Sequence, residues 1–343
     1  MATLLCLLLF NPVHTPKETT WGAKLGFPPD KKVLILHADD IGMCYEANAA
    51  AQRGLANGEY KSAALMVPCP WFNEMAEWGV AHPEYDLGLH MAMTSEWKTY
   101  RWGPVAPKDK VPGMLDSFGY LHRSVPAVVG SAKDEEIATE LRAQFDRAVA
   151  MGMKPSHIDT HMGTLYAKPG YTRAYMNLAV EKQVPAMVIE MTPRTLDKFR
   201  KQGYPFNDEM LKLITEYPLP KLDDFYGVEE GKTYEDKKNK FYTMIRQMQP
   251  GLNEYIFHPS IDTPGLKKIT GSWQHAHLGK SDVHGPRSAG IPQGTRGDHH
   301  QLERSNGTLQ EHEEVSNRLP DVINLQHHQQ RSPGSMPNVA SSP

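Results

Sequence analysis

Short apolar segments alternate with amphipathic helical segments between Lys31 and Trp273, and this alternation limits the fold more than any other feature of the chain. Successive strands separated by helices form a mainly parallel sheet that the helices cover. A helix is expected over 135–152, where apolar residues recur at helical spacing. The expected strands are 33–38, 62–68, a segment that begins near 86, 156–162, 185–191 and 254–260. The pattern predicts an α/β protein, with a barrel as the leading expectation.

Composition divides the chain into three parts. Residues 31–273 carry the strand and helix pattern and form the expected domain. Residues 274–343 contain no Phe, Tyr or Trp and are rich in Gln, His, Ser, Gly, Pro and Asn. Such a segment buries too little apolar surface to offset the entropy of ordering, so we expect a largely disordered polar tail. Residues 1–30 form an N-terminal segment whose apolar start resembles a weak signal peptide without a basic beginning or a clear cleavage site.

Charge and cysteine content exclude several functions. The chain has 37 Lys and Arg against 40 Asp and Glu, so no overall field favours nucleic acid or an anionic membrane. No apolar run approaches the roughly 20 residues that span a bilayer. The three cysteines have no metal-binding or disulfide-scaffold spacing and are expected to be buried thiols. A neutral small-molecule substrate fits best, while export, cytoplasmic location and a homodimer stay open.

Two adjacent carboxylates, Asp39 and Asp40, follow the expected strand 33–38 at its carboxyl end. Parallel α/β folds place ligand and catalytic groups at this end of the sheet. One carboxylate can bind a hard cation while its neighbour accepts a proton from water. A single Asp here would more often cap the next helix, but the pair favours a functional site.

Histidines occur at the same end of three other expected strands. His90 closes the strand near 86, and His258 closes 254–260, where it is placed to protonate a leaving amine. In the strand 156–162, alternation puts His157, Asp159 and His161 on one face. A helical reading would instead place His157 and His161 one turn apart, although the preceding proline favours the strand. His37, within the first strand, is expected to face away from the Asp pair or to pack.

The motifs HADDIG, DLGLHMAMTSEW and HIDTHMGT, in this order, resemble those of the YdjC-like (ChbG/HpnK) carbohydrate deacetylase family. The likeness runs from about Lys31 to ITGSWQ at 269–274. It implies a distorted (β/α) barrel that removes acetyl groups from N-acetylated sugars with one divalent metal ion, either magnesium or zinc.

The resemblance also assigns site residues. It implies the metal ligands Asp40, His90 and His157, the general base Asp39 and the acid His258. His161, Asp159 and Trp97 are then expected near the substrate, Trp97 because its ring can stack on a sugar.

The chain departs from the family pattern at two places. Many members continue the second histidine motif as HxDxHxH, but residue 163 is Gly here, so an imidazole that helps to select the sugar is missing. The polar segment after residue 274 replaces residues that complete the fold in other members. A shifted reading frame or a truncated gene produces such a pattern.

Two other functions fit the same residues. A metal site of this kind also hydrolyses esters or phosphoesters, because the ligands do not select the leaving group. A non-catalytic carbohydrate-binding protein with a structural metal is the second alternative, and the tryptophans 71, 97 and 102 fit either a binding surface or the core. Asp39 speaks against a binding module, which needs no free carboxylate beside the metal.

Overall fold

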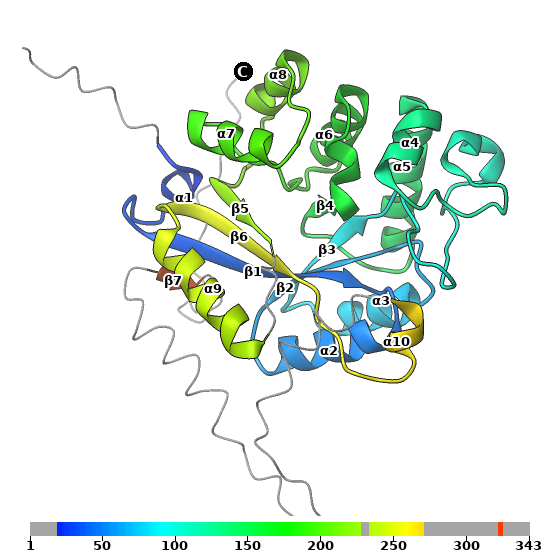
Figure 1. Ribbon diagram of the computed structural model, residues 1–343, viewed down its shortest axis with the longest axis horizontal. Helices are drawn as coiled ribbons and strands as arrows, with labels where there is room; N and C mark the ends of the chain where they lie inside the picture. Colours follow the sequence, from blue (N-terminus) through cyan, green and yellow to red (C-terminus); the bar gives the residue numbers. More distant parts are fainter. Residues whose placement is uncertain (1–18, 228–232, 271–321, 325–343) are drawn as a thin grey trace, which may run out of the picture.

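The structure is a computed structural model that describes residues 19–227, 233–270 and 322–324. All paired strands of its sheet are parallel, in the order β4-β3-β2-β1-β6-β5, and β7 adds to the free edge at the start of β1 (Figure 1). The strands are β1 (Lys32–Ile41), β2 (Ser62–Leu65), β3 (Asp86–Met91), β4 (Ile158–Thr160), β5 (Asp224–Tyr226), β6 (Gly251–Phe257) and β7 (Val322–Asn324).

The segment that follows α6 connects the two edges of this sheet. Ile158 of β4 forms a parallel bridge with Ala186, and Ile189 forms one with Leu222, which lies just before β5. The sheet therefore curls into a distorted barrel, as the sequence predicted. The expected strand 185–191 is wrong in detail, because only these two isolated bridges form there.

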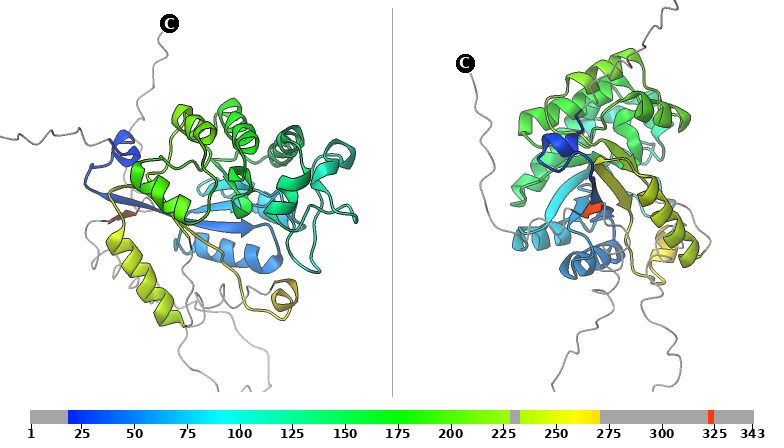
Figure 2. Two further views of the ribbon diagram at one scale, coloured as in Figure 1. Left: turned by 45° about the horizontal axis from the view of Figure 1, so that its top comes forward. Right: turned by 90° about the vertical axis from the view of Figure 1, so that its left-hand side faces the viewer.

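Helices cover the outside of the curled sheet on both of its sides (Figures 1 and 2). One group comprises α4 to α8, and the other comprises α2, α3 and α9. The helices are α1 (Trp21–Lys24), α2 (Tyr45–Ala56), α3 (Phe72–Ala81), α4 (Val125–Ser131), α5 (Asp134–Ala150), α6 (Pro169–Lys182), α7 (Pro193–Lys201), α8 (Asp208–Glu216), α9 (Tyr234–Gln247) and α10 (Leu266–Ile269), with short 3-10 turns at η1 (Lys108–Lys110), η2 (Pro112–Met114) and η3 (His161–Tyr166).

Helix α5 confirms the expected helix 135–152. Its apolar stripe of Ile137, Leu141, Phe145 and Ala148 is buried, which is the reason the segment folds against the sheet. Glu136 accepts a hydrogen bond from the backbone N–H of Lys133 and so closes the first turn.

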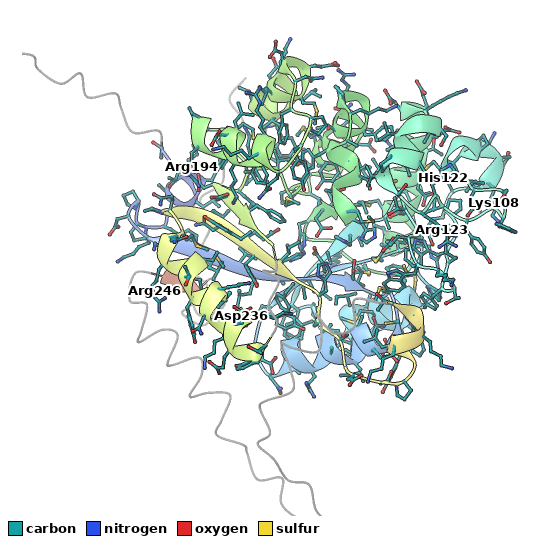
Figure 3. All side chains as sticks on the ribbon, viewed as in Figure 1. Lys108, His122, Arg123, Arg194, Asp236 and Arg246 are labelled. Carbon is teal, nitrogen blue, oxygen red and sulfur yellow. The ribbon has the colours of Figure 1, made fainter. Side chains whose placement is uncertain are left out.

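A long connection between β3 and α4, residues 92–124, lies at one side of the barrel. Lys108, His122 and Arg123 project from it, far from Arg194 and Arg246 on the opposite side of the molecule (Figure 3). Arg123 donates hydrogen bonds to the carbonyls of Glu96 and Trp97. These bonds hold the connection near the carboxyl end of β3.

The core supports the cysteine prediction. Cys44 and Cys69 are free and buried, and burial raises the pKa of the Cys44 thiol to about 12. Cys6 and the N-terminal apolar run lie outside the described residues, as does most of the predicted polar tail. Within the described part of the chain, no helix is both long and apolar enough for a membrane span.

A glycine in α2 fixes the strand that carries a candidate site residue. A Cβ at Gly54 would lie 2.4 Å from Cε1 of Tyr60, whose ring packs edge-on against Phe257 at 4.8 Å between centroids. Phe257 is the last residue of β6 and directly precedes His258. The small residue in α2 therefore sets the position of this strand end.

We expect Gly54→Ala to lower the free energy of unfolding by about 1–3 kcal/mol, because overpacking outweighs the gain in helix propensity. Gly130→Ala is the matched control, since a Cβ there meets no atom within 4 Å. The control should be neutral or more stable by up to about 1 kcal/mol. Urea denaturation of both variants measures the difference, and equal stabilities would contradict the packing argument.

Candidate metal centre and active site

Strands β1, β3 and β4 place polar groups at one end of the barrel. Asp40 lies near the end of β1, His90 lies near the end of β3, and His90 is in register with Asp159 of β4. His161 directly follows β4. Because the strands are parallel, these side chains meet at the carboxyl edge of the sheet.

The donor atoms of Asp40, His90 and His161 surround one point. Nε2 of His90 lies 3.4 Å from Oδ1 of Asp40, and Nδ1 of His161 lies 3.2 Å from the same oxygen. The two imidazole nitrogens are 3.2 Å apart. Atoms that bind one Zn²⁺ or Mg²⁺ at about 2.1 Å lie roughly 3.0–3.4 Å from one another, so the three residues fit such an ion. Oδ1 of Asp40 is buried without a hydrogen-bond partner, as expected for a ligand atom.

The remaining ring nitrogen of each histidine is held by a carboxylate. Nδ1 of His90 donates to Oδ1 of Asp159 at 2.6 Å, and Nε2 of His161 donates to Glu96 at 3.1 Å. A hydrogen bond of this kind fixes the tautomer and leaves the other nitrogen free to bind metal. Both imidazoles are therefore oriented before any ion arrives.

Two other groups of acidic and imidazole side chains lie nearby, but in each of them one imidazole is already hydrogen-bonded to Asp159. In the set Asp39, His90 and Asp159, the His90–Asp159 contact is a short hydrogen bond. In the set His37, His157 and Asp159, Nε2 of His37 bonds Asp159 at 3.1 Å. Among the described residues, Asp40, His90 and His161 form the group best suited to an ion.

Backbone geometry explains how two adjacent carboxylates serve one site. Asp40 has φ 63°, in the left-handed region that non-glycine residues rarely adopt. The strand continues to Ile41, so the prediction that Asp39 and Asp40 lie beyond the strand needs correction. In a regular strand the two side chains would face opposite ways. The unusual φ of Asp40 breaks this alternation, and strain of this kind collects at functional sites.

The structure places His161, rather than the predicted ligand His157, beside Asp40 and His90. Strand β4 contains only residues 158–160, so His157 precedes it, and its Nδ1 lies 3.3 Å from Oδ1 of Asp86. The expected single face of 156–162 fails because the chain turns after Thr160, with Met162 at φ 54° and Gly163 at φ 64°. The glycine at 163 was the available sign of this turn.

A buried polar chain leads away from the centre into the barrel. Nε2 of His37 bonds Asp159, and its Nδ1 pairs with Oγ of Ser62 at 2.8 Å. Ser62 in turn donates to Asp86 at 2.7 Å. Of the two expectations for His37, packing is confirmed, because the side chain is buried, but it lies on the same face as Asp39, since residues two apart in a strand share a face. Its Nε2 lies 3.3 Å from Oδ1 of Asp39.

These pairs shift the pKa values of their members. Burial alone would raise the pKa of Asp40, but the charge of His258 and the close imidazoles of His161 and His90 hold it well below its usual range. Burial would lower the pKa of His161, yet Glu96 and Asp40 raise it to about 9. Asp159 and Asp39 likewise overcome burial and raise the pKa of His90. A bound cation would compete with these protons.

Glu254 of β6 is a buried carboxyl that the sequence reasoning missed. Burial raises its pKa to about 7, although the nearby His37 opposes this shift. Its Oε1 has no hydrogen-bond partner. Strand alternation alone cannot distinguish such a residue from a solvent-facing glutamate.

A cavity of about 260 Å³ opens beside the centre, and Asp39, Asp159 and His258 line it. His258 follows β6, and its Nε2 lies 3.9 Å from Oδ2 of Asp40. Trp97 does not line this cavity and packs against Tyr100 and Trp102. The site therefore gathers the predicted Asp39, Asp40, His90, Asp159, His161 and His258, but neither His157 nor Trp97.

A curled parallel barrel with an Asp-His-His cluster at its carboxyl strand ends has the layout of an α/β-barrel enzyme with a candidate metal site. Residues 33–289 match the YdjC-like protein family, and the chain belongs to that family.

Named relatives agree with this assignment. A carbohydrate deacetylase of Thermus thermophilus is 30% identical over 68% of this chain and 80% of its own length. A chitooligosaccharide deacetylase of Yersinia enterocolitica is 29% identical over 46% of this chain and 60% of its own length. The fold resembles a crystal structure of an Enterococcus faecalis protein named for cellobiose-phosphate cleavage, with a TM-score of 0.58, 21% identity, and coverage of 70% of this chain and 86% of that one.

The two candidate ligand sets predict different metal-binding variants. We expect His161→Ala to weaken binding of Zn²⁺ at least 100-fold, because it removes a nitrogen next to Asp40 and His90. His157→Ala, the matched control, should bind within about threefold of the unchanged protein. Calorimetric titration with zinc at constant pH gives both affinities. If only His157→Ala lost zinc binding, the ligands would be Asp40, His90 and His157, as the family resemblance implies.

The buried carboxyl of Glu254 predicts a pH-dependent stability. Because its pKa rises from 4.5 to about 7 on folding, the folded state binds the proton more firmly, and stability falls as pH rises across this window. Glu254→Gln should reduce this slope between pH 4.5 and 7 and add up to about 3 kcal/mol at pH 8. Thermal unfolding from pH 4.5 to 8 measures the pH dependence of stability. Glu216→Gln, at an exposed position, is the control. If stability depended on pH equally in Glu254→Gln and in the unchanged protein, the raised pKa of Glu254 would be contradicted.

Proposed function

We propose that the protein is a metal-dependent carbohydrate deacetylase that hydrolyses the amide of N-acetylated sugars. The observation that carries this proposal is the cluster of Asp40, His90 and His161 beside a cavity that a second carboxylate, Asp39, lines. The names of the matched relatives support the same activity.

Asp40, His90 and His161 would hold the divalent ion. When bound, the ion polarises the acyl oxygen and makes water more acidic. Two nitrogens and one carboxylate oxygen suit zinc and also accept magnesium, so the donor set leaves both ions open.

Asp39 is proposed as the general base that takes a proton from the attacking water. It borders the cavity but contributes no atom to the Asp40, His90 and His161 cluster. Its buried Oδ1 lies 3.3 Å from Nε2 of His37 and 3.8 Å from Nδ1 of His90. These two imidazoles flank the carboxylate and keep it in place beside the cavity.

His258 is proposed as the acid that gives a proton to the departing amine. Its side chain is 48% exposed, and it lines the cavity opposite the buried end of the barrel. The water oxygen joins the acyl carbon, the C–N bond breaks, and the amine nitrogen takes the proton from His258.

The cavity bears on the alternative functions. Among the described residues, no Lys or Arg lines the cavity, so its walls lack a permanently charged side chain for a phosphate group. This favours an amide over a phosphoester. A binding module with a structural ion would have no use for the second carboxylate of Asp39. Release of acetate from N-acetylglucosamine oligomers separates the deacetylase from both alternatives.

We expect Asp39→Asn to lower kcat for acetate release by about 10²–10⁴-fold, because the amide cannot accept the proton. EDTA should abolish release, and added zinc or magnesium should restore it. Asp109→Asn, on an exposed turn, is the matched control and should retain full activity. Full activity of Asp39→Asn with intact metal binding would remove this residue from the mechanism.

A further inference from the structure

The cavity beside the metal centre has mostly apolar walls. Its inner side is buried, with Tyr166, Ile189, Phe199 and Phe206 each at most 9% exposed. Met162, which is 50% exposed, lies at the outer side. The other apolar or aromatic lining residues are Met187, Met191, Tyr204, Phe225 and Ile256, of which only Tyr204 carries a hydroxyl. Three of the lining residues, Met162, Met187 and Met191, are methionines, whose flexible side chains adapt to ligands of varied shape.

An acetyl group is far too small for this space. The cavity volume is about 260 Å³. A methyl group is close in size to a water molecule, whose share of liquid volume is roughly 30 Å³. An acetyl methyl would therefore leave the apolar part of the cavity, around Ile189, Phe199 and Phe206, largely without contacts.

The inner walls offer few hydrogen-bonding groups to a sugar. The hydroxyl of Tyr166 donates to the carbonyl of Met187 at 2.6 Å, and Oγ1 of Thr160 accepts from the backbone N–H of Leu165 at 3.1 Å. A sugar buried there would leave several hydroxyls poorly paired, which is costly. An aliphatic chain has no such groups and gains from burial.

The position of His258 indicates which part of the substrate enters. As the proposed acid, His258 marks the amine side of the scissile bond, and its half-exposed side chain faces the solvent side of the site. The sugar carries the amine and keeps its hydroxyls near water there. The acyl group then extends from the centre toward Ile189 and Phe206.

We propose that the cavity is an acyl-chain pocket and that the preferred substrate is an N-acyl amino sugar with a chain of roughly four to eight carbons. This inference rests on the proposed function, because it deepens the choice of substrate at the same site. Each methylene that enters the pocket should raise kcat/KM by roughly fourfold.

The test is a chain-length series on the zinc-loaded protein. N-acetyl-, N-butyryl- and N-hexanoylglucosamine all release glucosamine, so one amine assay measures every substrate. We expect kcat/KM for the hexanoyl compound to exceed that for the acetyl compound at least tenfold. Met187→Trp fills the pocket and should abolish this preference, whereas the volume-conserving Met187→Leu should keep it.

A binding measurement separates this inference from the proposed function. The hexanoyl compound should bind at least tenfold more tightly than the acetyl compound in calorimetry with Asp39→Asn. Cleavage of the acetyl amide without any gain from longer chains would overturn the acyl pocket and leave the deacetylase intact. Tighter hexanoyl binding without cleavage of any amide would support the pocket and overturn the proposed function. Absence of both cleavage and chain-dependent binding would overturn both.

Discussion

The carboxylate of Asp159 is the interaction on which the centre of the barrel depends. One oxygen accepts a hydrogen bond from His90 of β3 at 2.6 Å, and the other accepts one from His37 of β1 at 3.1 Å. Strands β1 and β4 are not neighbours in the sheet, so this carboxylate joins strands across the barrel interior. It orients His90 for the candidate metal site and holds His37 beside Asp39. Removal of Asp159 would therefore disturb the proposed ligand and the proposed base together.

Burying so many charged groups is costly unless each has a partner. In this barrel, hydrogen bonds link Asp86, Ser62, His37, Asp159 and His90 in one chain, so that each imidazole contacts a carboxylate. The pairing lowers the pKa of Asp159 well below its usual range, with His90 and His37 overcoming the effect of burial. Glu254 lacks such a partner for Oε1, which explains why its pKa moves in the opposite direction.

Local patterns predicted the fold better than the details of the site. Apolar alternation located β1, β2, β3 and β6, and helical spacing located α5. Apolar alternation failed over 185–191. The backbone pairing there is confined to two bridges, and these depend on the curl of the whole sheet.

The site residues show the same limit. Asp40, His90 and His258 follow from their places at strand ends. The exchange of His157 for His161 could not be predicted from alternation, because it depends on where β4 stops and on two left-handed residues after it. Glu96 lies within the motif DLGLHMAMTSEW, but neither it nor Glu254 could be given a role from the sequence, since that role arises only when distant segments meet.

The bond between Glu96 and His161 has a consequence for folding. Glu96 belongs to the long connection 92–124, whereas Asp159, the partner of His90, belongs to the barrel strand β4. One imidazole is thus aligned by the barrel and the other by a segment outside it. Both imidazoles are oriented only when the connection 92–124 is packed against the barrel. A bound ion would therefore stabilise the fully folded protein over partly folded forms in which the connection is detached.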